Sequence, residues 1–254
     1  MTRYRRQDVV IRPLDGHDEL AACLELQRIT WGVGFAETVP PAILYVAQRT
    51  GGVASGAFAP DGRLLGFVFG ISGVEDGRLI HWSDMLAVHP GARGLGVAIA
   101  LKLHQRELLL ERGIDLVYWT FDPLEARNAH INFRRLGVVV RRYMRDVYGD
   151  TGSDLHAGIG TDRLLAEWYI SSDHVRDRLA GRVPPAPADA VRITVPLDIQ
   201  AVKAADPEAA RATRSFTRDA FEDYLGRGRV VVDVERAHDA LHYLLVPAGA
   251  APVL

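Results

Sequence analysis

The sequence has little of several residue types, and each scarcity excludes a class of protein or site. Cys23 is the only cysteine among 254 residues, so the chain can form neither an intrachain disulfide nor a thiolate metal site. Cys23 also falls on one helical stripe with Leu20, Leu24 and Trp31. We therefore expect it to be a buried core residue rather than a nucleophile.

Net charge and long apolar runs are equally scarce. The formal net charge of −2 gives no electrostatic footprint for nucleic acid or an anionic membrane. No apolar run approaches the roughly 20 residues of a membrane span, and Met1–Arg6 leads into a polar segment rather than a signal core. We expect a cytoplasmic protein that binds neither nucleic acid nor membrane.

The stretch from Ser83 to Ala98, SDMLAVHPGARGLGVA, carries the clearest functional signal. An apolar run ends at Pro90, and Arg93, Gly94 and Gly96 directly precede a helical pattern, which predicts a strand, a tight turn and a helix start. The first backbone N–H groups of a helix have no intrahelical partner and carry about half a positive charge. A phosphate group is the natural ligand there, and Arg93 would add a guanidinium to the same anion.

Two nucleotide-binding loops are also rich in glycine, and single residues tell against each of them. A Walker loop needs a lysine directly after its last glycine, whereas the next lysine here is Lys102, well inside the helix. A dinucleotide fingerprint needs Gly or Ala where Ile99 stands, and it normally lies in the first strand–helix unit of a domain. We therefore favour neither loop.

The stretch resembles the acyl-CoA loop of the GNAT superfamily of N-acyltransferases, whose signature is R/Q-x-x-G-x-G/A after a strand that ends in Val-x-Pro. Here the strand ends in Val88-His89-Pro90, and the following loop fills every position of the motif. The resemblance implies that acetyl-CoA is the acyl donor and that no metal ion takes part. It implies backbone contacts to the pantetheine arm from Leu86, Ala87 and Val88, and a pyrophosphate held by Arg93, Gly94, Leu95, Gly96, Val97 and Ala98.

The flanking sequence predicts the order of elements of the same superfamily over residues 8 to about 172. The expected fold is α+β: a central mixed, mostly antiparallel sheet, splayed at the acyl-CoA site and flanked by helices. Glycine and proline turns separate the periodic segments. We expect helices at 15–31, 41–49, 95–112 and 127–136, and strands at 9–14, 53–58, 64–71, 79–88, 115–121, 138–148 and 163–170.

Beyond this region the sequence predicts a tail joined to the first domain. We expect an acyltransferase domain at 1–172, a helix and Pro-rich linker at 173–190, and a C-terminal αβ extension at 191–254. The helix at 95–112 has two apolar stripes, one of which needs a partner besides the sheet, so we expect the extension to pack on the first domain. Its own helix, capped by Asp206 and ended by Gly226, has an apolar stripe at Ala212, Phe216, Ala220 and Tyr224.

Transfer of an acyl group to an amine calls for a base, because an alkylamine with a pKa of about 10.4 is mostly protonated at neutral pH. Asp84 stands where many GNAT enzymes carry a carboxylate suited to this role, and a structural role for it is equally open. His81, on the opposite face of the same strand, is an alternative base, although an ordinary buried or exposed histidine is the favoured interpretation.

The second motif of the superfamily, N-x-x-A-x-x-L-Y-x-K-x-G-F, is only partly present. Aligned on Gly137, the chain has Ala126 in place of Asn and Phe133 in place of the Tyr that often protonates the departing CoA sulfur. A phenyl ring cannot donate a proton. Phe133 and Asn128 are nevertheless candidate cofactor-binding residues, although a helix cap is the favoured role for Asn128.

Two hypotheses follow from these motifs. The first is an acetyl-CoA-dependent N-acetyltransferase, from a bacterial branch with a C-terminal extension, that acts on a primary amine of a small molecule or peptide. The second is a non-catalytic acyl-CoA-binding sensor that keeps the fold and has lost the acid. Whether the chain forms a homodimer is left open.

Overall fold

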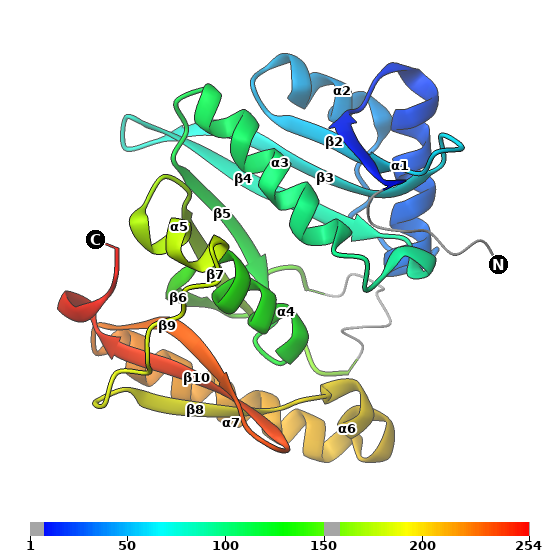
Figure 1. Cartoon of the computed structure of the whole chain (residues 1–254). Coiled ribbons are helices and arrows are strands. Elements are labelled where there is room, and N and C mark those ends of the chain that lie inside the picture. The colour runs from blue at the N-terminus through cyan, green and yellow to red at the C-terminus, as the bar shows by residue number, and fades with distance from the viewer. Residues whose placement is uncertain (1–7, 150–157, 254) are drawn as a thin grey trace. The chain divides into compact units, whose positions relative to one another are not determined.

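The computed structural model describes residues 8–149 and 158–253, which form two compact units (Figure 1). The first unit covers residues 8–117, and the second covers 118–149 and 158–253. The chain passes from one unit to the other within strand β5 (Leu116–Phe121). The domains expected at 1–172, 173–190 and 191–254 stay a prediction. The two compact units divide the chain between Val117 and Tyr118 instead.

The first unit contains an antiparallel sheet with the strand order β1-β2-β3-β4. Strands β3 and β4 form a hairpin because Asp76 and Gly77, with φ of 50° and 77°, supply the two left-handed residues of a tight turn. Gly62, with φ of 83°, closes the turn before β3. The strands are β1 (Val10–Pro13), β2 (Val53–Phe58), β3 (Leu64–Glu75) and β4 (Arg78–Val88).

Helices cover both faces of this sheet: α1 (Gly16–Trp31) and α2 (Pro41–Arg49) on one face, and α3 (Val97–Glu111) on the other. Phe67 belongs to the core cluster of α1 and α2, whereas a Cβ on its neighbour Gly66 would lie 3.1 Å from Val97 of α3. Successive residues of a strand point to opposite faces, so α3 lies opposite α1 and α2.

The expected interior position of Cys23 is confirmed, since its side chain is fully buried in the core cluster of α1 and α2. Burial raises the pKa of its thiol to about 12, which leaves it uncharged and unreactive. Asp15 is the N-cap residue of α1, but its side chain makes no capping hydrogen bond. The backbone N–H of Asp15 instead donates to the carboxylate of Glu19 at 2.8 Å, so the acidic residue of the first turn closes the helix start.

The helix α3 differs from expectation on its buried face. Val97, Leu101 and Leu109 are buried there as apolar residues, but Lys102 and Gln105 are buried beside them. The expected second stripe, through Ile99, Leu103 and Leu110, is only half-buried. The spacing of apolar residues therefore misses the polar groups that α3 carries into the interior.

The second unit contains an antiparallel arrangement with the strand order β7-β6-β9-β10-β8. Strand β9 pairs with β6 through Val140 and Val231, so residues after the Pro-rich linker continue the sheet. The expected strand at 138–148 ends earlier, at Met144. The strands are β6 (Val139–Met144), β7 (Arg163–Tyr169), β8 (Val191–Pro196), β9 (Arg229–Arg236) and β10 (Ala240–Pro247).

The helix expected at 127–136 consists of two parts. A short α-helix, α4 (Ala126–His130), continues as a π-helical segment, η3 (Ile131–Leu136), which Gly137 ends with φ of 73°. Such wide turns are uncommon and leave no trace in the spacing of apolar residues. The remaining helices of this unit are α5 (Asp173–Leu179), α6 (Ile199–Ala205) and α7 (Pro207–Gly226).

The expected apolar stripe on α7 is wrong. Phe216 is 65% exposed, and the buried residues are Ala210, Arg214, Thr217 and Phe221. Arg214 is buried because its guanidinium donates to Asp122 at 2.6 Å and to the carbonyl of Ile159 at 3.1 Å. An arginine paired with Asp122 thus lies on the packed face, where the sequence pattern predicts an apolar residue. The expected cap is confirmed, since Asp206 accepts from two backbone N–H groups.

Buried polar contacts join the tail to the earlier part of the second unit. Asp233 of β9 accepts from Arg178 of α5 and from Arg134 of η3, each at 2.9 Å. The hydroxyl of Tyr243 on β10 donates to the carbonyl of Pro123 at 2.6 Å. Residues 191–253 thus share one core with residues 118–149. None of the helices in the described part of the chain is long and apolar enough to cross a bilayer.

Candidate functional site

The loop between β4 and α3 has the backbone geometry that its sequence predicts. A short 3₁₀ turn, η2 (Pro90–Ala92), follows the strand, and the ring of His89 fixes it by accepting from the N–H of Gly91 at 3.1 Å. Gly94 and Gly96 have φ of 84° and 77°, a left-handed conformation that residues with side chains rarely adopt. Gly96 is the residue that caps α3.

The loop presents unpaired donors and positive charge. Within the described chain, the backbone N–H groups of Gly94, Gly96, Val97 and Ala98 donate to no other residue. The first turn of α3 contains no acidic residue, and the guanidinium of Arg93 is exposed beside it. A Cβ at Gly94 would meet no atom within 4 Å, so the approach to the loop is open. These features fit a pyrophosphate.

A β-bulge divides β4 just before this loop. The register passes from Ile71↔Trp82 to Phe69↔Met85, so that Ser83 and Asp84 both lie opposite Gly70. Glycine is required at position 70, because a Cβ there would lie 2.3 Å from the ring of His81. The bulge places Ser83 in the interior and leaves Asp84 exposed.

The carboxylate of Asp84 is a stronger base than an ordinary surface carboxylate, because its pKa is raised. The surrounding protein raises the pKa of Asp84, chiefly because it removes water from around the charged carboxylate. A hydrogen bond from Trp82 lowers this pKa, and the negative charge of Glu37 raises it further. Its side chain nevertheless reaches solvent. Asp84 can therefore accept a proton from an incoming group more readily than an ordinary surface carboxylate.

His81 lies in a buried polar network instead. It is fully buried, with Nδ1 3.0 Å from Ser72 Oγ and Nε2 3.1 Å from Gln105 Nε2. The amide of Gln105 is a donor, so Nε2 accepts and Nδ1 carries the proton. Burial, and then the charges of Lys102 and Arg112, lower the pKa of His81 to about 3. This arrangement fits a structural role and tells against His81 as a base.

The network continues to α3 and back to the bulge. Lys102 Nζ donates to Ser83 Oγ at 2.7 Å and to Gln105 Oε1 at 3.3 Å, and Ser83 Oγ donates to Gln105 Oε1 at 3.0 Å. Burial lowers the pKa of Lys102 to about 7. The network thus ties the strand on which Asp84 lies to the helix that begins at the glycine loop.

Comparison with known proteins places the fold. No protein-family model matches the chain, and no curated protein matches its sequence. The solved structure of the NatC complex bound to Gag peptide and CoA is similar to the chain, with a TM-score of 0.51 and 17% identity over 64% of this chain and 98% of the other. The chain has the GNAT fold.

Two further structures share this GNAT fold. The ribosomal-protein-S18-alanine N-acetyltransferase from Escherichia coli has a TM-score of 0.50 at 18% identity and covers 64% of this chain and 94% of its own. Chaetomium thermophilum Naa20, in complex with a bisubstrate analogue, has a TM-score of 0.50 at 16% identity and covers 66% and 92%. The GNAT fold thus accounts for about two thirds of the chain.

Two residues expected to contact the cofactor, Asn128 and Phe133, lie in the second unit of the chain. Asn128 is exposed inside α4, whose cap is Glu125, so the expected capping role is wrong. Phe133 is fully buried, with ring centroids 6.1 Å from Phe121 and 5.9 Å from Tyr243. Its ring belongs to an aromatic core, so a direct contact of Phe133 with a cofactor has no support in its surroundings.

The sequence gives little signal for the polar groups around the bulge. Lys102 and Gln105 stand among apolar residues of a helical pattern, and no spacing rule distinguishes a buried lysine from an exposed one. His81 and Ser83 face Lys102 and Gln105 only because α3 packs against β4 in the folded chain. In the described residues, no group of three His, Cys, Asp or Glu side chains is placed to hold a metal ion.

Proposed function

We propose that the chain is an acyl-CoA-dependent N-acyltransferase, and that it transfers an acetyl group from acetyl-CoA to a primary amine. The single observation that carries the proposal is the glycine loop at the start of α3, with its left-handed glycines, unpaired N–H groups and exposed Arg93. The GNAT fold supports it, since solved structures of this fold include a complex with CoA.

In this proposal the backbone binds the donor. The N–H groups of the loop and the guanidinium of Arg93 hold the pyrophosphate. His89 N donates to Leu65 O at 2.8 Å, so by the alternation of an antiparallel ladder the N–H and C=O groups of Leu86 and Val88 point away from β3. They are free of that ladder and suited to bond the amides of a pantetheine arm.

Asp84 is the proposed base. The neutral amine attacks the thioester carbonyl, the new N–C bond forms as the C–S bond breaks, and the amine proton passes to Asp84 directly or through one water. The raised pKa of Asp84 improves its match to the amine as a proton acceptor. The departing thiolate takes its proton from solvent, because the phenyl ring of Phe133 cannot supply one. His81 is no longer part of the proposed site.

One observation favours a second function. Phe133 replaces the usual proton donor and is enclosed by other aromatic rings, which suits a chain that binds acyl-CoA without turning it over. Release of free CoA thiol in the presence of a panel of primary amines distinguishes the enzyme from such a sensor. The primary amine acceptor and a cytoplasmic location stay predictions.

Titration calorimetry with acetyl-CoA tests the proposal that both functions share. We expect saturable binding by the wild type, and at least a tenfold loss of affinity in Arg93→Glu, because a charge-assisted hydrogen bond contributes about 1.5–3 kcal/mol. Arg28→Glu is the matched control, an exposed arginine on α1 whose carboxylate partner lies 3.7 Å away. No saturation of the wild type, or equal losses in both variants, would contradict the proposal.

A further inference from the structure

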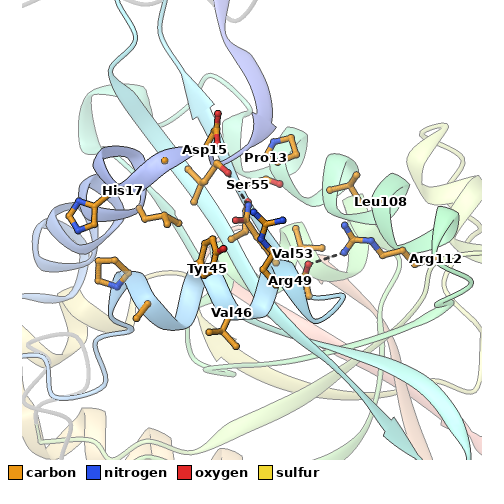
Figure 2. Close-up of a pocket in the computed structure, with 18 residues that line it drawn as sticks. Pro13, Asp15, His17, Tyr45, Val46, Arg49, Val53, Ser55, Leu108 and Arg112 are labelled. Atoms are coloured by element: carbon orange, nitrogen blue, oxygen red, sulfur yellow. Dashed lines mark hydrogen bonds between the residues drawn. The ribbon is translucent and has the colours of Figure 1, made fainter.

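The first unit contains a cavity of about 820 Å³ that the acyltransferase proposal does not use (Figure 2). It lies between α2, the turn from β1 into α1, the start of β2 and the last turns of α3. Its volume is within the range of small-molecule sites, which is roughly 300–1,000 Å³. The cavity is therefore large enough for a ligand of its own.

The cavity exists because β1 is shorter than β2. Strand β1 ends at Pro13, opposite Ser55, and the chain then turns into α1. The first residues of β2, before Ser55, are therefore not paired with β1. The side chain of Gln48 seals this edge, since its Nε2 donates to Leu14 O at 3.1 Å and to Ala54 O at 2.7 Å. With these carbonyls bonded, the edge is unsuited to pairing with a further strand.

Two guanidinium groups supply positive charge to the cavity. Arg112 is held in place, because its Nη1 donates to Gly51 O at 2.9 Å and to Gly52 O at 2.8 Å. Its Nη2 makes no hydrogen bond within the described chain and remains a donor for a ligand. Arg49 lies over the ring of Tyr45 at 5.1 Å, and both residues line the cavity. Figure 2 shows Arg49, at the end of α2, and Arg112, directly after α3, beside the same space.

A buried hydroxyl adds a neutral donor. Ser55 Oγ is fully buried and has no hydrogen-bond partner within the described residues, although Ser55 lines the cavity. An unsatisfied buried hydroxyl costs free energy, so a ligand oxygen that accepts from it would be stabilised. Asp15 is the one carboxylate among the lining residues, against two arginines. The polar part of the cavity is therefore suited to an anion.

The rest of the wall is apolar. Leu20, Pro41, Val46 and Leu108 line the cavity, and the ring of Tyr45 is about half exposed beside them. An apolar or aromatic ligand body would remove these surfaces from water.

We propose that this cavity is a second ligand site, which binds a small carboxylic acid with an apolar body. The carboxylate lies between Arg49 and Arg112 and accepts from Ser55, and the apolar body lies against Tyr45 and Val46. The site is separate from the glycine loop. Arg112 lies 16 positions after Gly96, so at about 1.5 Å per residue roughly 24 Å of helix separates the two sites. The proposal does not rest on the acyltransferase activity.

Benzoate is the probe, and its neutral relative benzamide is the matched control ligand. Titration calorimetry on the full chain should give saturable binding of benzoate and at least tenfold weaker binding of benzamide, because the amide cannot form charge-assisted hydrogen bonds. Arg49→Gln should weaken benzoate binding about tenfold, since it removes one such bond from an exposed position that the fold does not need. Arg28→Gln, on α1 outside the cavity, should bind benzoate as the wild type does.

A second variant fills the cavity without removing charge. Val46→Trp, at a half-exposed position of α2, should abolish benzoate binding while the melting temperature stays close to that of the wild type. Saturating CoA should leave benzoate binding in place. The proposal is overturned if millimolar benzoate gives no saturation, if benzamide binds equally well, if Arg49→Gln or Val46→Trp binds like the wild type, or if CoA displaces benzoate competitively.

Discussion

Lys102→Met should make the protein more stable and remove part of the dependence of its stability on pH. Lys102 is 4% exposed, and burial lowers its pKa from 10.5 to about 7. Between these two values the unfolded chain binds more protons at this site than the folded chain. The free energy of unfolding of the wild type should therefore rise with pH across this window, and Lys102→Met should lack that rise.

The structure sets the size of the effect. A pKa gap of about three units, at about 1.4 kcal/mol per unit, gives an upper limit of roughly 4–5 kcal/mol for the cost of the buried lysine at neutral pH. Methionine has a similar length, and Ser83 Oγ still donates to Gln105 Oε1 at 3.0 Å. After subtracting the hydrogen bonds that Lys102 donates, we expect a net gain of about 2 kcal/mol at pH 7.

Urea unfolding at a series of pH values between about 7 and about 10 measures both effects. The control is Lys203→Met, which removes the only other lysine of the chain, on α6. This variant should keep the pH dependence of the wild type. The reasoning is refuted if Lys102→Met is less stable than the wild type throughout, or if it retains the full rise in stability with pH.

Two further predictions concern the proposed base and the tail. Asp84→Asn should lower turnover by about 10²–10⁴-fold with little change in CoA affinity. In the wild type, kcat/KM should fall as the pH drops through the raised pKa of Asp84; an equal loss of turnover and CoA affinity would assign Asp84 to structure. Truncation after Ala180 removes Arg214 from buried Asp122, at a cost of roughly 3–5 kcal/mol. A truncated chain that melts at the full-length temperature would show the tail to be dispensable.

Local patterns in the sequence predict most of the helices and strands. Pro41 at the first helical position and the glycines after Arg49 define α2 as observed, and Asp206 and Gly226 do the same for α7. The glycine loop is also predicted with its conformation, because only glycine readily adopts the left-handed geometry found there. These features depend on residues that are near one another in the chain.

The errors arise where burial depends on a distant partner. The buried face of α7 includes Arg214 because Asp122 lies 92 positions earlier, and no stripe of apolar residues records that pair. His81 lies among Ser72 and Gln105 for the same reason. The cavity beside α2 likewise combines residues from β1, α1, α2, β2 and α3 and has no sequence motif.

The β-bulge at Ser83 and Asp84 also determines how β4 tolerates a change in length. Odd-numbered residues are buried from His81 to Ala87, which resembles the alternation of one continuous face. In fact Ser83 faces α3, whereas Met85 belongs to the core cluster of α1 and α2. Deleting Asp84 would restore simple alternation and leave Ser83 facing α3 and Met85 facing α1 and α2, because both halves of the strand keep their register with β3. A single deletion in a regularly paired part of β4 would instead turn one half of the strand over and mismatch its core, while a deletion at the exposed hairpin end would only shorten a turn.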